Sequence, residues 1–108
     1  MNQLTNIAIL LAVIFVQTCN KPATNSKSAK ELLGNPEYQA ICFGGFRENT
    51  RDICPTVEEL KEDLRILAAM NIAFIRTYNT QLYPHAERTL QAIHELKQED
   101  SNFEMFVM

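Results

Sequence analysis

The chain has 108 residues, of which 46% are hydrophobic and 21% charged, and its formal net charge is -3. This composition is that of a globular protein and excludes a disordered or collagen-like chain. Because the 10 basic residues are spread among 13 acidic ones, nucleic acid is not an expected partner.

The first 20 residues carry no charged side chain, and residues 7–16 form an unbroken apolar run. This run is too short to span a bilayer as a helix, which needs ~20 residues, but it suits the hydrophobic part of an export signal. Residues 1–19 are therefore predicted to be an export signal, although no Lys or Arg precedes the apolar run.

The end of this segment, Val16-Gln17-Thr18-Cys19, resembles a bacterial lipoprotein signal, in which the Cys is lipidated and becomes the new amino terminus. Cys19 is the expected lipidation site, and the resemblance implies a periplasmic, outer-membrane or cell-surface protein held on the membrane by its lipid. A plain secretory signal and an uncleaved anchor are the alternatives. Each of the three takes the rest of the chain out of the cytoplasm.

Residues 20–35 are predicted to be a polar linker. Their central stretch, KPATNSKSAK at residues 21–30, is rich in Ser, Ala and Thr and cannot bury enough apolar surface to order itself. The folded part is therefore expected to comprise residues 36–108, which allows only a small core.

The first strand is expected within residues 38–46, where Ile41, Cys42 and Phe43 form a short continuous apolar run. Continuous apolarity is typical of a strand buried on both faces, as in parallel sheets. In such a strand Cys42 would behave as a small buried hydrophobe. A disulfide between Cys42 and Cys54 is an open alternative in an oxidising compartment.

The first helix has the clearest start signal in the sequence. Thr56 and Glu59 form a T-x-x-E capping box, and further acidic residues in the early turns favour a helix amino terminus. Apolar residues then recur at spacings of three and four, which predicts one buried stripe. The members of this stripe are Val57, Leu60, Leu64 and Leu67.

The remaining elements alternate between strand and helix. A strand is expected at residues 72–78, a helix at about residues 84–98, and a third strand at residues 103–108, where the chain stops as if interrupted. The order β-α-β-α-β with short connections predicts parallel crossover units. The buried side of the second helix is expected to carry Ala86, Leu90, Ile93 and Leu96 or Lys97.

Polar residues follow the first two predicted strands, and functional side chains of parallel α/β folds gather at these carboxyl ends. Arg, Tyr and Asn side chains there suit a neutral polar ligand such as a sugar. The alternatives are solvated charges in the loop after the first strand, and a buried Arg76 that pairs with a helix carboxylate at the end of the second strand. The residues concerned are Arg47, Glu48, Asn49, Arg51 and Asp52 after the first strand, and Arg76, Tyr78 and Asn79 after the second.

No metal site and no dinucleotide cofactor are expected. The sequence has no C-x-x-C pair, and His85 and His94 are nine residues apart, off any single helix face. Gly44-Gly45 lacks the G-x-G-x-x-G spacing, and Pro55 rather than a Gly precedes the helix.

Four stretches together resemble a bacterial branch of glycoside hydrolase family 17, whose members act on β-1,3-glucans as endo-hydrolases or transglycosylases. The resemblance implies the first β-α-β-α-β portion of a (β/α)8 barrel, truncated after the third strand, a retaining mechanism and no cofactor. The two catalytic Glu residues of that family follow its fourth and seventh strands, so neither has a counterpart here. The stretches are AICFGGFRENTRD, PTVEELKEDLRIL, IAFIRTYNT and PHAERTLQAIHE.

The resemblance also implies a polysaccharide (β-glucan) cleft lined by five residues of this chain. Glu48 and Asp52 are not expected to replace the missing catalytic pair, because a complete barrel supplies the walls that raise a carboxyl pKa. In the family a Tyr is common where Phe43 stands and an Asp where Asn79 stands. The five expected substrate-binding residues are Phe43, Arg47, Glu48, Arg76 and Tyr78.

These observations predict the front of an exported β-1,3-glucanase or glucanosyltransferase that is inactive by itself. One alternative is a small non-enzymatic lipoprotein with a three-stranded, flavodoxin-like α/β domain that binds a sugar or a partner. Another is the start of an unrelated barrel, such as a deoxyribose-phosphate or sugar isomerase. The FRENTRD loop and the export signal disfavour the last of these.

Overall fold

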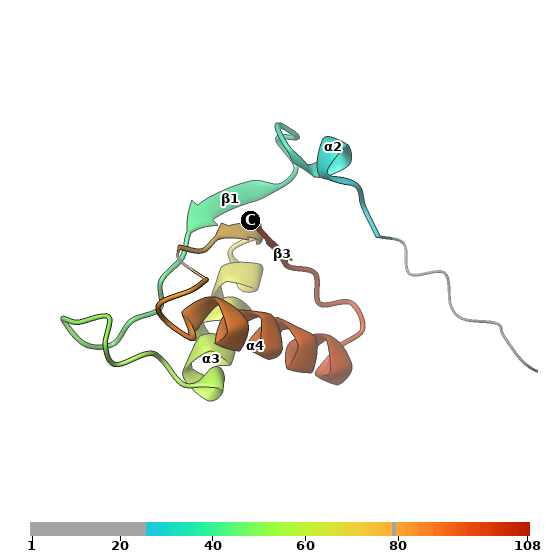
Figure 1. Ribbon diagram of the computed structural model, residues 1–108. Helices are drawn as coiled ribbons and strands as arrows, with labels where there is room; N and C mark the ends of the chain where they lie inside the picture. Colours follow the sequence, from blue (N-terminus) through green and yellow to red (C-terminus); the bar gives the residue numbers. More distant parts are fainter. Residues whose placement is uncertain (1–25, 79) are drawn as a thin grey trace, which may run out of the picture.

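A computed structural model describes residues 26–78 and 80–108 of the chain (Figure 1). The predicted export signal with Cys19, the start of the linker, and Asn79 lie outside the described residues. The elements are the helices α2 (Ala29–Leu32), α3 (Val57–Ala69) and α4 (His85–Glu99) and the strands β1 (Gln39–Cys42), β2 (Ile72–Arg76) and β3 (Phe106–Val107).

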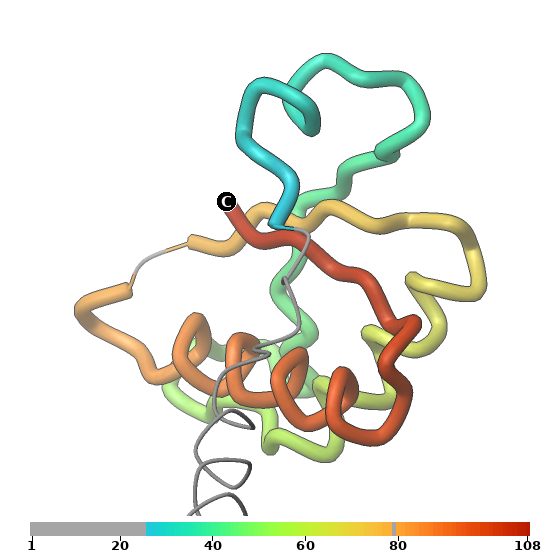
Figure 2. The backbone as a smooth tube through the Cα atoms, turned by 90° about the vertical axis from the view of Figure 1, so that its right-hand side faces the viewer, coloured from blue at the N-terminus to red at the C-terminus, as the bar shows by residue number. Residues whose placement is uncertain are grey.

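The three strands form one parallel sheet in the order β1-β2-β3, which confirms the predicted crossover units. Ile41 pairs with Ile75 and Cys42 with Arg76, so the carboxyl ends of β1 and β2 lie at the same level. Figures 1 and 2 show α3 and α4 together on one face of this sheet. The described part of the fold is therefore two layers thick there, helices against strands.

Helix α3 begins and ends where local chemistry requires. The predicted capping box is confirmed, because the Glu59 amide donates to Thr56 Oγ1 (3.2 Å) and the Thr56 amide donates to Glu59 Oε2 (2.8 Å). At the other end Asn71 adopts φ 62°, a left-handed conformation that Asn tolerates better than most residues. Its amide donates to the Ala68 carbonyl (2.9 Å), which closes the last turn.

The core lies between the sheet and the two helices. Of the predicted stripe of α3, Leu60 and Leu64 are fully inaccessible to solvent, and Val57 and Leu67 are partly buried against the core. On α4 the prediction is wrong for Leu90, which is 55% exposed, because the helix turns Thr89 and Ala92 inward instead. The core consists of Phe43, Leu60, Leu64, Ile75, Ala92, Ile93, Leu96 and Met105.

Strand β1 differs from the prediction that both of its faces are buried. All four of its residues are exposed, including Ile41 (41% exposed) and Cys42. The physical reason is that β1 is an edge strand and the helices cover one face of the sheet. Cys42 is therefore an exposed free thiol rather than a buried hydrophobe, and Cys54 is also free.

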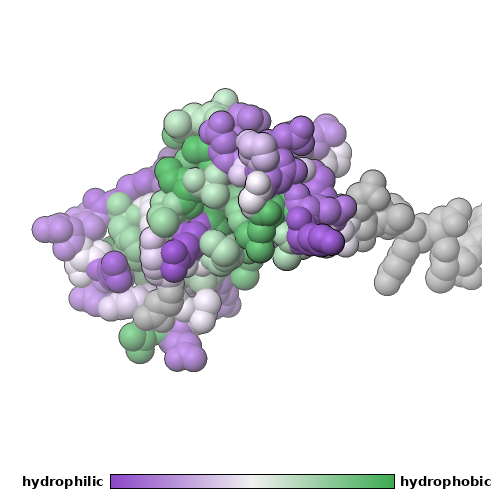
Figure 3. All heavy atoms as spheres, turned by 90° about the horizontal axis from the view of Figure 1, so that it is seen from above, coloured by the Kyte–Doolittle hydropathy of each residue, from purple (hydrophilic) through white to green (hydrophobic). Residues whose placement is uncertain are grey.

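The opposite face of the sheet is partly covered by the amino-terminal segment. Part of the predicted linker forms α2, whose Leu32 is buried. Lys27 Nζ lies 4.8 Å from the centre of the Tyr38 ring and pairs with Glu104 (2.7 Å), and the Tyr38 ring contacts Phe106 edge to face at 5.8 Å. Viewed from above, this face shows an apolar patch between polar surroundings (Figure 3).

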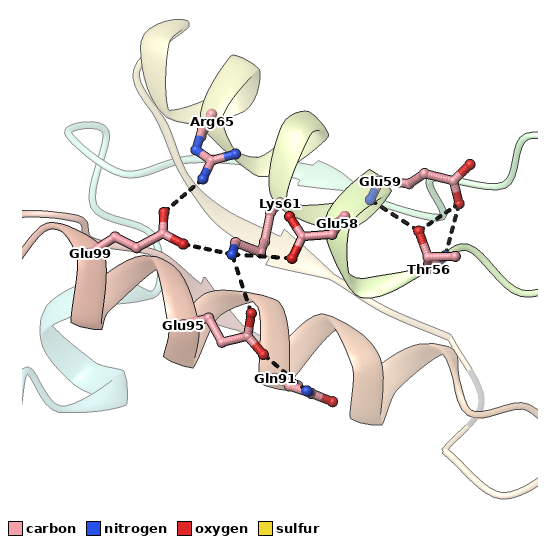
Figure 4. Close-up of polar contacts among 8 residues, drawn as sticks. All are labelled: Thr56, Glu58, Glu59, Lys61, Arg65, Gln91, Glu95 and Glu99. Carbon is pink, nitrogen blue, oxygen red and sulfur yellow. Dashed lines mark hydrogen bonds and ion pairs between the residues drawn. The ribbon is translucent and has the colours of Figure 1, made fainter.

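Helices α3 and α4 are joined by an ionic cluster around Lys61 (Figure 4). Although Lys61 is only 6% exposed, its ammonium group contacts three carboxylates. These belong to Glu99 (2.6 Å), Glu95 (3.2 Å) and Glu58 (3.4 Å), and Glu99 also pairs with Arg65 (2.7 Å). The carboxylates raise the pKa of Lys61, so it stays charged and offsets the repulsion between them.

Candidate functional site

The carboxyl edge of the sheet brings residues from β1 and β2 together. The Phe43 amide donates to the Arg76 carbonyl (2.9 Å), so pairing continues one residue past β1. Side chains alternate between the two faces of a strand. Since Ile75 and Phe43 point into the core, Arg76 and Cys42 point to the face away from the helices.

Arg76, Tyr78 and Cys42 form a small polar and aromatic group at this edge. The Arg76 guanidinium carbon lies 5.5 Å from the centre of the Tyr78 ring, and the ring is 47% exposed. A hydrogen bond with Cys42, followed by partial burial, raises the pKa of Tyr78, against an opposing effect of the nearby Arg76 charge. Tyr78 is therefore a neutral phenol that presents both a ring face and a hydroxyl group.

Such a group can bind a carbohydrate without performing chemistry on it. An aromatic face packs against the C–H face of a sugar ring, while guanidinium and hydroxyl groups hydrogen-bond to its hydroxyls. Arg76 and Tyr78 are thus brought together at the end of the second strand. Cys42 was not predicted here, and its alternation with the core residue Phe43 is the signal that could have placed it.

The structure places Arg47 against helix α3. Its guanidinium forms two parallel bonds with the Asp63 carboxylate (2.8 and 2.9 Å) and a third with the Glu59 carbonyl (3.2 Å). Asp63 accordingly raises the pKa of Arg47. In the described structure Arg47 therefore anchors the loop after β1 to α3.

Phe43 and Glu48 also differ in their surroundings. Phe43 is 7% exposed and belongs to the core, where its ring lies on the helix side of the sheet. Glu48 is exposed in the loop after β1, which extends well beyond the sheet (Figure 1). Of the five residues predicted to bind substrate, only Phe43 is buried. Glu48, Arg76 and Tyr78 are exposed, and Arg47 is exposed but paired with Asp63.

A close approach at Gly45 fixes the path of this loop. Gly45 has φ 64°, and a side-chain carbon added there would lie 3.0 Å from Leu60 Cδ2 and 3.1 Å from both Asp63 Oδ2 and the Phe43 ring. Only Gly satisfies both conditions. The loop can therefore reach Asp63 with Arg47 because it first passes directly over α3.

Two hollows of the described surface involve strand β3 and the amino-terminal segment. One of about 250 Å³ lies on the sheet face opposite the helices and is mostly apolar. A larger one, of about 710 Å³, is bounded by Lys27, Lys97 and Glu104 near the amino-terminal end of β3. The smaller hollow is lined by Ala29, Leu32, Leu33, Phe74, Phe106, Val107 and Met108.

The carboxyl groups whose pKa departs from the ordinary value do not resemble a general acid, because a general acid needs a raised pKa. Among the described residues, four carboxyl groups have a shifted pKa, and in each the pKa is lowered. They are Glu31, Glu59, Glu95 and Glu99. For Glu95 the main cause is the hydrogen bond from Gln91, followed by Lys61, and for Glu99 the main cause is Lys61. Glu95 and Glu99 therefore contribute to the packing of α4 against α3.

Two further properties concern the described residues alone. No group of three or more His, Cys, Asp or Glu side chains there is arranged to hold a metal ion. None of the helices between residues 26 and 108, as far as they are described, combines the length and apolarity that a membrane crossing requires.

The fold and the site define an α/β protein with a parallel sheet and a carbohydrate-compatible group at its carboxyl edge. A scan against family models and a search of curated proteins found no match. Among solved structures, the chain is similar to the crystal structure of an endo-laminarinase from Formosa Hel1_33_131, with 55% sequence identity and a TM-score of 0.73.

That similarity covers 76% of this chain and 21% of the laminarinase chain. The present sequence thus spans about a fifth of the length of the protein it matches. The identity supports a relation to a β-1,3-glucan-degrading enzyme over the shared residues.

Proposed function

We propose that residues 36–108 form the first part of a (β/α)8 glycoside hydrolase barrel of the family 17 type, which acts on β-1,3-glucan by a retaining mechanism. The observation that carries the proposal is the 55% identity to an endo-laminarinase. The parallel β-α-β-α-β order is compatible with the front of such a barrel.

In this proposal Arg76 and Tyr78 line the glucan cleft. A glucose ring would pack on the exposed face of Tyr78, with its hydroxyl groups accepting hydrogen bonds from the Arg76 guanidinium. Glu48, in the exposed loop after β1, would contribute to the same cleft. Phe43 and Arg47 would act indirectly, through the core and through Asp63.

The catalytic pair is not supplied by residues 1–108 in this proposal. A retaining glycosidase needs two carboxyl groups ~5–5.5 Å apart, one as acid and one as nucleophile. In family 17 they follow the fourth and seventh strands, whereas the described residues contain three strands. We therefore expect these residues to bind glucan and to release no sugar from it.

We also propose that the protein is exported and held at the membrane by a lipid on Cys19. The support is the apolar run followed by Cys19 in the sequence. Labelling cells with a radioactive fatty acid tests this directly. The wild-type chain should carry the label and Cys19→Ala should not, and equal labelling of the two would contradict the proposal.

Sequencing the source gene beyond codon 108 tests the enzymatic proposal. An open frame with a Glu after a fourth and a seventh predicted strand supports it, and a stop codon directly after Met108 contradicts it. Binding of β-1,3-gluco-oligosaccharides to the full chain is the complementary test. Arg76→Ala should weaken binding about tenfold, as expected for a charged hydrogen-bond donor, and the matched variant Arg65→Ala on α3 should not.

A further inference from the structure

His85, the first residue of α4, is buried against the loop that follows β1. It is 2% exposed. Its ring stacks on Phe46 with centroids 5.0 Å apart and planes at 18°, and it lies 6.0 Å from the Phe43 ring. It also forms a hydrogen bond with the Gly44 backbone. Each of these three neighbours belongs to the stretch that leaves β1.

One nitrogen of this buried ring has no partner. Among the described residues, nothing hydrogen-bonds to His85 Nε2. An unpaired polar atom of this kind is costly in a protein interior. The cost is acceptable only while the imidazole is neutral, because a charged ring would have a second N–H donor to satisfy. The position therefore favours the neutral form of His85 over the charged form.

We propose that His85 is a positioning residue that fastens the loop at residues 44–48 to the first turn of α4. The loop then has two independent attachments. Arg47 ties it to Asp63 on α3, and His85 ties it to α4 through Gly44 and Phe46. The second attachment has no salt bridge and consists of the contacts of the His85 ring. Its strength therefore depends on whether that ring is protonated.

The charged groups described around His85 would not stabilise the positive charge of its protonated ring. In the loop, Arg47 is already paired with Asp63 of α3, and on α4 the Arg88 guanidinium donates to the carbonyls of Cys54 (3.1 Å) and Pro55 (2.9 Å). Glu87, next to His85 in sequence, is exposed. Burial lowers the pKa of His85, against a smaller opposing effect of the Gly44 bond.

The sign of the pH dependence follows from this lowered pKa. When the loop is released, the His85 ring binds a proton with the ordinary His pKa of 6.5. When the loop is fastened, the pKa of His85 is lowered and the ring binds a proton less readily. Fastening is therefore complete above pH 6.5 and weakens as the pH falls below that value. The loop that carries Glu48 would accordingly open under mildly acidic conditions.

Hydrogen exchange of the full chain, measured by mass spectrometry, tests the proposal. His85→Phe keeps a stacking ring and removes the bond to Gly44, so amides 44–48 should exchange about tenfold faster, as expected for the loss of one hydrogen bond. The matched control is His94→Phe, an exposed position on the same helix whose ring contacts Gln98. It should leave amides 44–48 unchanged.

A pH series separates positioning from a general structural role. In the wild-type chain the protection of amides 44–48, corrected for intrinsic exchange, should fall below pH 6.5, and in His85→Phe this step should be absent. The proposal is overturned if the step persists in His85→Phe, if amides 44–48 exchange at the wild-type rate, or if the α3 amides accelerate equally. Because no glucan is present, failure of the proposed function would leave this result unaffected.

Discussion

Replacing Gly45 with Ala tests whether the loop after β1 is held by close contact with α3. Two costs are expected. An L-residue in the left-handed region costs about 1–2 kcal/mol, and forcing a methyl group to within 3.0–3.1 Å of Leu60, Asp63 and Phe43 adds about 1–3 kcal/mol. The expected loss of stability for Gly45→Ala is therefore about 2–5 kcal/mol.

Gly34 provides a matched control. It also has a positive φ, 78°, but a side-chain carbon added there would meet nothing within 4 Å. Gly34→Ala should therefore lose only the conformational part, about 1–2 kcal/mol. The effect of Ala on the unfolded chain is common to both variants and cancels in their difference.

The measurement is urea-induced unfolding of the full chain and of both variants, followed by circular dichroism. Gly45→Ala should have the lower midpoint of the two, with the same dependence on urea concentration. Equal midpoints would refute the reasoning, because the difference rests on the contacts with Leu60, Asp63 and Phe43 alone. A lower midpoint for Gly34→Ala would refute it as well.

Three other changes are predicted. Leu64→Ala should destabilise the chain by about 2–5 kcal/mol, because it leaves a cavity at a fully buried position. Thr56→Ala should destabilise it by about 1 kcal/mol, because the amino-terminal cap of α3 is lost. The urea midpoint measures both effects. Lys61→Met should lower the midpoint at pH 7, because it leaves Glu95 and Glu99 without their cation. Since the folded state lowers the pKa of both carboxyls, wild-type stability should fall as the pH drops through 4.5 and below. This fall should be smaller in Lys61→Met, and an unchanged pH profile would contradict the assignment of the cluster to helix packing.

The sequence by itself determined the elements whose causes are local. The Thr56–Glu59 capping box and the spacing of Leu60 and Leu64 depend on residues three or four apart, so α3 could be located and its buried side identified. The alternation of strands with helices likewise determined the parallel order of the sheet. The sequence also placed Arg76 and Tyr78 at the carboxyl end of the second strand, where both lie.

Tertiary structure decided which partner each side chain has. Whether Cys42 is buried depends on what covers an edge strand, and whether Leu90 or Thr89 faces inward depends on how α4 rotates against the sheet. Likewise, nothing near Arg47 in the sequence indicates that Asp63, 16 residues away, holds it.

His85 is the clearest example of a side chain whose partners the sequence could not reveal. In the sequence it is a lone His considered only as a metal ligand, and in the fold it is a buried ring stacked on Phe46. The physical reason is that burial and pairing depend on contacts between segments far apart in the chain, whereas caps and periodicity depend on contacts within one turn. The sequence could therefore determine the elements and their order, but only the packing of α4 against the loop after β1 could assign a role to His85.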